Sequence, residues 1–172
     1  MLESGRPRMT APPADLRILV CGASDRGDDG AALAAISQVL PVLPEPLRSR
    51  IEVRRCPELQ VSDLIAVHAG EACLVLDTVG GIDPGSLVSV SLADLASRFD
   101  GLTLRSVRAL SVEDTLLIAD DVCGAMPRGT FVGIGGRWFG YGERFSRVVT
   151  AGLPAFREEI RVAIEDLLRV RL

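Results

Sequence analysis

The sequence is poor in several residue types on which whole classes of protein depend. His68 is the single histidine among 172 residues, so a metal site built from several imidazoles is excluded. The four cysteines, Cys21, Cys56, Cys73 and Cys123, are widely spaced and form no Cys-x-x-Cys pair. Their spacing indicates neither a zinc site nor a disulfide framework, and we expect small buried hydrophobic side chains.

Basic charge and long apolar runs are also lacking. The net charge of -4 argues against a nucleic-acid partner, which would favour a basic face. No apolar run approaches the roughly 18 residues that span a bilayer, so no membrane insertion is expected. The first fifteen residues lack the apolar core of a signal peptide. These features together predict a cytoplasmic protein.

The patterns that are present predict an α/β fold. Residues 1–14, rich in Arg and Pro, are expected to be a disordered tail, and residues 15–172 a single domain. Strands alternate with helices, which predicts a three-layer α/β/α sandwich around a mostly parallel, twisted, five-stranded sheet. A short connection makes the fourth strand an antiparallel edge strand. The strands are expected at residues 16–22, 51–56, 72–79, 86–92 and 130–136, and the helices at 30–40, 61–70, 112–122 and 146–170, the last with a bend at Pro154.

Acidic side chains follow two of the expected strands. Asp28 and Asp29 come after the first strand, and Asp77 ends the third. In open α/β sheets ligands bind beyond the carboxyl ends of the strands, so Asp29 and Asp77 converge if their strands are neighbours. Such a crevice would repel a phosphate and attract a cation. The alternative is that Asp28 and Asp29 simply cap the following helix.

Several segments, in order, resemble the hydrogenase maturation proteases. These endopeptidases remove the C-terminal extension of a nickel–iron hydrogenase large-subunit precursor after nickel insertion. The resemblance implies that two acids and one histidine bind nickel supplied by the substrate protein, with Asp29 and Asp77 as the catalytic, metal-contacting acids. The segments are "ILVCG", "RGDDGAA", "LVLDTVGGIDPG", "SVRALSVEDTLLIA" and "VGIGGRWFGYGERFSRVVTAGLPAFREEIRVAIEDL".

One position departs from this family pattern. Arg108 stands where the family has its histidine, and a guanidinium has no lone pair to offer a metal. Arg108 would instead repel a cation, pair with Asp29 and Asp77, or be a solvated loop residue. His68 is no substitute, because it precedes the third strand and should lie at the opposite end of the sheet from Asp77.

Three functions therefore remain open from the sequence. The first is a maturation endopeptidase acting on a hydrogenase precursor. The second is a non-catalytic paralogue that binds a precursor or an assembly factor without cleaving it. The third is a small-molecule or nucleotide-binding flavodoxin-like domain. It is weakened because the chain has neither a Gly-x-Gly-x-x-Gly turn nor a P-loop, and because acids stand where phosphates would bind.

Aromatic residues make up only 4% of the chain, yet several of them gather in residues 137–145, "RWFGYGERF". This segment holds the single tryptophan and the single tyrosine, together with two arginines. Such a composition suits a partner-binding surface. It equally suits a loop that covers the core, and both interpretations remain open from the sequence.

Overall fold

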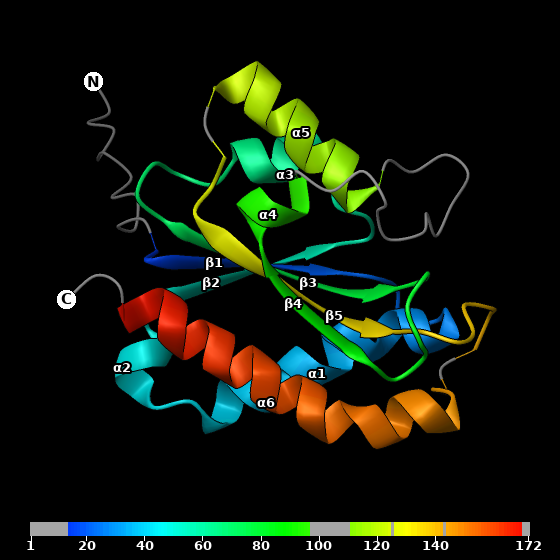
Figure 1. The fold of residues 1–172 in the computed structure, drawn as a ribbon. Helices are drawn as coiled ribbons and strands as arrows, with labels where there is room; N and C mark the ends of the chain where they lie inside the picture. The colour runs from blue at the N-terminus through cyan, green and yellow to red at the C-terminus, as the bar shows by residue number, and fades with distance from the viewer. Residues whose placement is uncertain (1–13, 97–110, 125, 143, 170–172) are drawn as a thin grey trace, which may run out of the picture.

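A five-stranded sheet forms the centre of the molecule (Figure 1). The computed structural model describes residues 14–96, 111–124, 126–142 and 144–169. Neighbouring strands are parallel except at one edge, where β4 runs antiparallel to β5. The predicted sandwich with one antiparallel edge strand is therefore confirmed. The strands lie in the order β2 (Ile51–Cys56), β1 (Leu16–Cys21), β3 (Ala72–Val79), β5 (Gly129–Gly135) and β4 (Leu87–Ser91).

Helices cover both faces of the sheet (Figure 1). One face carries α1 (Ala31–Val39), α2 (Glu45–Arg48) and α6 (Arg147–Arg169), with the 3₁₀ turns η1 (Gly27–Gly30) and η2 (Leu40–Val42). The other face carries α3 (Val61–Ile65), α4 (Leu92–Ala96) and α5 (Val112–Cys123). No helix in the described ranges is both long and apolar enough to cross a membrane. Of the predicted disordered tail, residues 1–13 lie outside the described residues.

The central strands are apolar throughout because both of their faces are buried. Ile18 and Leu74 pack against the side of α1 and α6, whereas Leu19 and Val75 belong to the core beneath α3, α4 and α5. Each of these four side chains is fully buried. Burial of a side chain of this size contributes about 1.5–3 kcal/mol to folding, so these two apolar layers fix the direction and register of the strands.

The described cysteines belong to the core, as expected. Cys21, Cys56 and Cys73 are buried and carry free thiols. Burial raises the pKa of the Cys56 thiol to about 11 and that of Cys73 to about 12. Both are therefore neutral and unreactive at physiological pH, like small apolar side chains. The side chain of Cys123 lies outside the described part of the chain.

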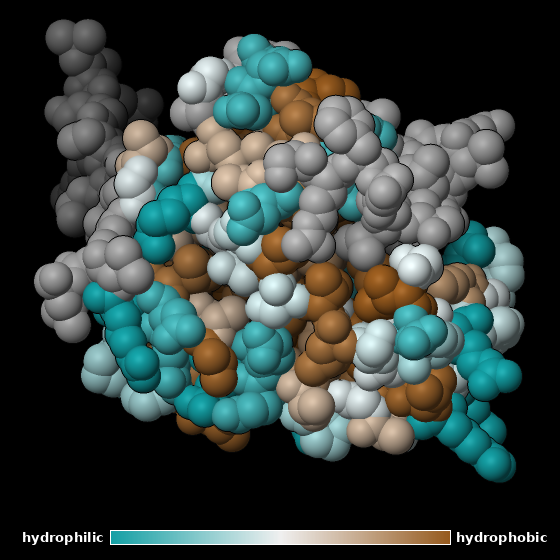
Figure 2. All heavy atoms as spheres, viewed as in Figure 1, coloured by the Kyte–Doolittle hydropathy of each residue, from teal (hydrophilic) through white to brown (hydrophobic). Residues whose placement is uncertain are grey.

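The edge strand β4 is only half covered. Leu87, Val88 and Val90 are partly buried against the two cores, while Ser89 is exposed. In the space-filling view, apolar side chains show between polar ones on the face of the molecule along which β4 runs, above α6 (Figure 2). Short length and alternating exposure are common at sheet edges, where they limit pairing with other chains.

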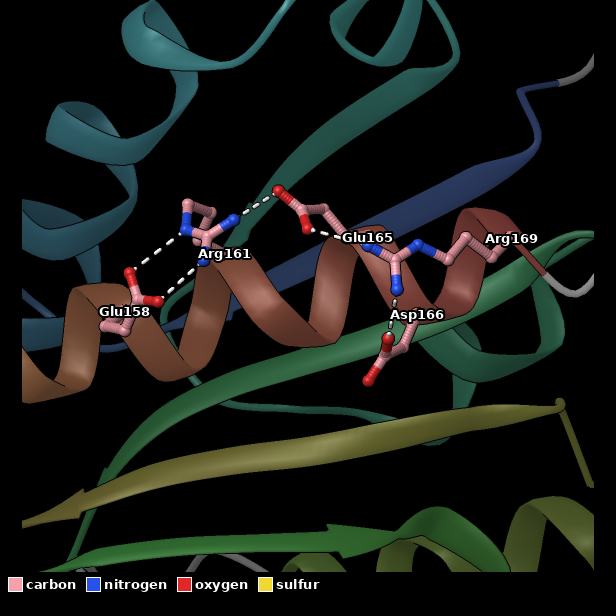
Figure 3. A network of polar contacts seen from close by, with 5 residues as sticks. All are labelled: Glu158, Arg161, Glu165, Asp166 and Arg169. Atoms are coloured by element: carbon pink, nitrogen blue, oxygen red, sulfur yellow. Dashed lines mark hydrogen bonds and ion pairs between the residues drawn. The ribbon is translucent and has the colours of Figure 1, made fainter.

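The exposed side of α6 is held by charged pairs one turn apart (Figure 3). Arg161 pairs with Glu158 and Glu165, and Arg169 pairs with Glu165 and Asp166. The hydrogen bond from Arg161 holds the pKa of Glu158 below its usual value. Pairs of this spacing support a helix locally, but exposed ion pairs add little to global stability.

One helix prediction needs correction. The helix expected over residues 61–70 ends at Ile65. Its N-cap residue is Gln60, whose backbone N–H donates a hydrogen bond of 3.0 Å to Asp63 in the first turn. Pro154 lies inside α6, which continues as one helix to Arg169, and the bend expected there stays a prediction. The carbonyl that Pro154 leaves unpaired belongs to Thr150, an exposed residue that water can reach.

A serine side chain caps the start of α5. Ser111 precedes the helix, and its Oγ accepts a hydrogen bond of 3.0 Å from the backbone N–H of Asp114. This bond satisfies one of the N–H groups that a helix start leaves unpaired. The cap fixes where α5 begins, directly after the segment that contains Arg108.

Candidate functional site

The loop after β1 folds back tightly on itself. Gly22 has a φ of +119°, and a Cβ there would lie 2.0 Å from the carbonyl oxygen of Asp29, so only glycine fits. The side chain of Asp29 turns back into the loop, and its Oδ2 accepts a hydrogen bond of 2.8 Å from the backbone N–H of Ala23. Asp29 is 9% exposed. Asp29 is thus nearly buried, and its carboxylate is oriented by the backbone of its own loop.

The preceding residue, Asp28, is fully buried and joins two distant parts of the chain. Its Oδ2 accepts hydrogen bonds from the backbone N–H groups of Arg137 (2.8 Å) and Trp138 (3.0 Å) and from Ser146 Oγ (2.8 Å). Its Oδ1 accepts a bond of 2.7 Å from the backbone N–H of Ser146. Because α6 begins at Arg147, Asp28 anchors both the loop after β5 and the start of α6.

The helix-cap interpretation of the two acids is therefore wrong in its simple form. The residue at the cap of α1 is Gly30, and no side chain hydrogen-bonds to that helix start. Asp28 and Asp29 lie two residues and one residue earlier, inside η1. The carboxylate of Asp28 bonds to the loop after β5, and that of Asp29 bonds to the backbone of its own loop. The two acids therefore differ: Asp28 anchors distant segments, and Asp29 is held within its own loop.

Asp77 lies within β3 rather than at its end, because the strand continues to Val79. The side chain is 2% exposed, and its Oδ1 accepts a hydrogen bond of 2.8 Å from the backbone N–H of Thr78. Asp77 occupies the strand position between Val75 and Val79, both of which belong to the core beneath α3, α4 and α5. A carboxylate in such an apolar layer is costly unless it has partners or a function.

The structure brings the segments of Asp29 and Asp77 to the same end of the sheet. Strands β1 and β3 are parallel neighbours, and Asp77 follows Leu76, which pairs with Val20 of β1. The turn η1, which contains Asp29, packs against β3. Both aspartates thus lie toward the carboxyl ends of adjacent central strands, as the sequence predicts. That the two carboxylates bind one ion stays a prediction.

His68 lies at the other end of the sheet, as expected. It is exposed and immediately precedes the turn into β3, where its backbone N–H donates to Glu71 Oε2 (2.9 Å). Asp77 is five residues beyond the start of β3 at Ala72, about 17 Å along a strand. A mainly apolar cavity of about 540 Å³ adjoins His68 at this far end. It lies away from the edge where α/β sheets bind nucleotides.

The third predicted site residue, Arg108, lies outside the described residues. Within the ranges that the structure describes, no group of three or more His, Cys, Asp or Glu side chains could hold a metal ion. Asp29 and Asp77 offer carboxylate oxygens, which are acceptable but incomplete ligands for a transition metal.

Both interpretations of residues 137–145 hold in part. Phe145 packs against the core next to α6, which fits a covering role. Trp138 and Tyr141 are 47% and 75% exposed, which fits a contact surface. Sequence reasoning missed Arg26, whose guanidinium lies 4.0 Å from the centre of the Tyr141 ring. Nothing in the sequence near Arg26 indicates this contact, because the two residues are 115 positions apart.

Replacing Asp28 should destabilise the whole domain. In the parent protein, backbone N–H donors meet a carboxylate oxygen of Asp28, whereas in Asp28→Asn some of them would face the N–H groups of an amide. We expect a loss of about 3 kcal/mol in the free energy of unfolding. Urea titration followed by circular dichroism measures this loss. The matched control is Asp25→Asn, an exposed acid of the same loop, which should change stability by less than about 0.5 kcal/mol. Equal stability of the two variants would contradict the anchoring role.

Comparisons with known proteins agree on the fold. No protein-family model matches the sequence, and no curated protein matches it significantly. Among solved structures, the hydrogenase maturating endopeptidase HybD from E. coli matches with a TM-score of 0.69 and 15% identity over 88% of this chain and 92% of that one. An endopeptidase from Escherichia coli matches with a TM-score of 0.61 and 18% identity, over 87% of this chain and 93% of that one.

A third structure comes from an archaeon. The NiFe hydrogenase maturation protease HybD from Thermococcus kodakarensis matches with a TM-score of 0.55 and 21% identity, over 86% of this chain and 98% of that one. All three comparisons span nearly the full length of both chains, so the likeness concerns the whole domain. The resemblance indicated by the sequence motifs is thus confirmed at the level of architecture, and this chain has the fold of the nickel–iron hydrogenase maturation proteases.

Proposed function

We propose that this chain is an endopeptidase that removes the C-terminal extension of a nickel–iron hydrogenase large-subunit precursor. One observation carries the proposal. The turn that contains Asp29 packs against β3, the strand that contains Asp77, at the carboxyl ends of adjacent central strands. This arrangement occurs in a fold shared with proteins described as hydrogenase maturation proteases.

In this proposal the two carboxylates recognise nickel that the precursor already holds. Each aspartate accepts a hydrogen bond from a nearby backbone N–H, so its orientation is fixed before the substrate arrives. Two oxygen ligands leave room for ligands from the precursor, which makes binding depend on a loaded metal. The metal, as part of the substrate, would supply Lewis-acid polarisation of the scissile carbonyl. Asp29 and Asp77 would position the precursor for that step.

The second candidate is a non-catalytic paralogue that binds a precursor or an assembly factor. The observation that favours it is Arg108 at the position of the family histidine. A permanent positive charge close to the two carboxylates would weaken their attraction for a cation. The two candidates differ in one measurable respect, because only the first predicts a shortened precursor.

The cleavage test uses purified protein and a nickel-loaded large-subunit precursor. We expect a C-terminally shortened product by mass spectrometry, with the rate reduced at least about 100-fold in Asp29→Asn and Asp77→Asn, because each loses a charged ligand. Asp25→Asn, which alters an exposed acid of the same loop, should cleave at the parent rate. Binding of the precursor without cleavage by any form would contradict the endopeptidase proposal and support the paralogue.

A metal titration addresses the role of Arg108 separately. The unmodified protein should bind nickel weakly, and Arg108→His should bind at least about tenfold more tightly, because it restores an imidazole ligand and removes a charge. Calorimetry measures the nickel affinity of both proteins. Arg108→Ala separates the effect of losing the charge from the effect of gaining a ligand. Tight binding by the unmodified protein that survives Arg108→Ala but not Asp29→Asn would show that Arg108 does not act at the site.

A further inference from the structure

The loop after β5 presents the two exposed aromatic side chains of the described residues. Trp138 is 47% exposed and Tyr141 75% exposed, whereas Phe131 and Phe156 are fully buried in the core. Large aromatic side chains gain most from burial, so leaving two of them in solvent on one loop is unfavourable for an isolated domain. Tryptophan, tyrosine and arginine are also the residues that most often dominate binding at protein interfaces.

The indole of Trp138 is held by glycines on both loops. A Cβ at Gly27 would lie 2.5 Å from Cε3 of Trp138, and a Cβ at Gly140 would lie 2.6 Å from its Cζ2. Any other residue at either position would push the ring away. The ring therefore rests directly against backbone, which restricts its rotation while about half of the residue remains exposed.

Tyr141 is held in a similar way by Arg26. The Arg26 guanidinium carbon lies 4.0 Å from the centre of the tyrosine ring, within the range of a cation–π contact. The Nη2 of Arg26 also donates a hydrogen bond of 3.2 Å to the tyrosine hydroxyl. Both side chains are exposed, so this pair fixes an arginine and an aromatic ring at the surface rather than in the core.

Backbone hydrogen bonds join the two loops into one rigid unit. Gly27 donates to the carbonyl of Gly142 (2.7 Å), Gly142 donates to that of Asp25 (2.8 Å), and Asp28 donates to that of Trp138 (2.9 Å). The buried carboxylate of Asp28 adds its own bonds to the same loop. A surface fixed before binding loses little conformational entropy when a partner arrives.

The charge of this surface indicates the chemistry of its partner. Arg26 and Arg137 are exposed beside the two aromatics, in a protein whose net charge is -4. The described acids of the same loops are Asp25, which is exposed, and Asp28 and Asp29, whose side chains are turned inward. Carboxylates pair well with guanidinium groups, and an extended backbone can lie flat on aromatic rings.

We propose that Arg26, Arg137, Trp138 and Tyr141 form a docking surface for an acidic, extended peptide segment of a partner protein. The surface follows β5, which pairs with β3, so it continues the edge that carries Asp77. A segment bound there would lead toward the candidate site. Assigning the segment to a hydrogenase precursor rests on the proposed function, whereas its acidic character rests on the surface alone.

The sole tryptophan makes this proposal directly measurable. The protein is titrated with a twelve-residue peptide of alternating glutamate and glycine while Trp138 fluorescence is recorded. A second titration uses the same peptide with glutamine in place of every glutamate. We expect a saturable change with the glutamate peptide, binding at least about tenfold tighter than the glutamine peptide and weakening as salt rises. Arg26→Ala should lose about tenfold in affinity, with its melting temperature unchanged. Arg55→Ala, an exposed arginine on β2, is the matched control and should bind like the parent.

Several results would overturn the docking surface. The first is equal affinity for the two peptides, and the second is binding by Arg26→Ala as tight as that of the parent. The third is a Trp138 fluorescence signal that does not change at saturating peptide. The fourth is tighter binding of a twelve-nucleotide single strand than of the glutamate peptide. Failure of precursor cleavage with normal peptide binding would instead count against the endopeptidase proposal and leave the surface supported. Normal precursor cleavage by Arg26→Ala and Trp138→Ala would overturn the assignment of the segment to the precursor.

Discussion

The arrangement of the candidate site depends on the buried carboxylate of Asp28. Four hydrogen bonds from the loop after β5 and from the start of α6 meet at its two oxygens. A charged group with no exposed surface is tolerated only when its lone pairs are filled in this way. Asp28 therefore joins the loop after β1 to the loop after β5 and to the start of α6, which the sheet alone would not hold together. It also helps to position its neighbour Asp29.

This anchoring gives adjacent residues different tasks. Asp28 holds the loops together, while the carboxylate of Asp29 is oriented within its own loop by the N–H of Ala23. The same anchoring places Trp138 and Arg137 over the loop of Arg26, because their backbone N–H groups bond to Asp28. One buried acid thus supports both the proposed nickel-recognition site and the proposed docking surface.

The sequence predicts the sheet well, because apolar runs covered on both faces have few alternative arrangements. The strand expected over residues 72–79 is observed as Ala72–Val79, and the antiparallel edge strand follows from its short connection. The site is harder to predict. Asp28 and Ser146 are 118 positions apart, so their contact has no local sequence signal. Asp77 lies inside β3, two residues before its end at Val79, as the predicted range of residues 72–79 already implied.

The central claim is that Asp29 and Asp77 share a site for one cation. The most direct measurement is anomalous diffraction from crystals of the unmodified protein soaked in millimolar cadmium, a concentration that compensates for weak binding. The account predicts an anomalous peak between the two carboxylates, within roughly 2–2.5 Å of an oxygen of each. Carboxylates more than about 10 Å apart, too far for both to reach one ion at such bond lengths, would contradict it, as would cadmium bound only elsewhere.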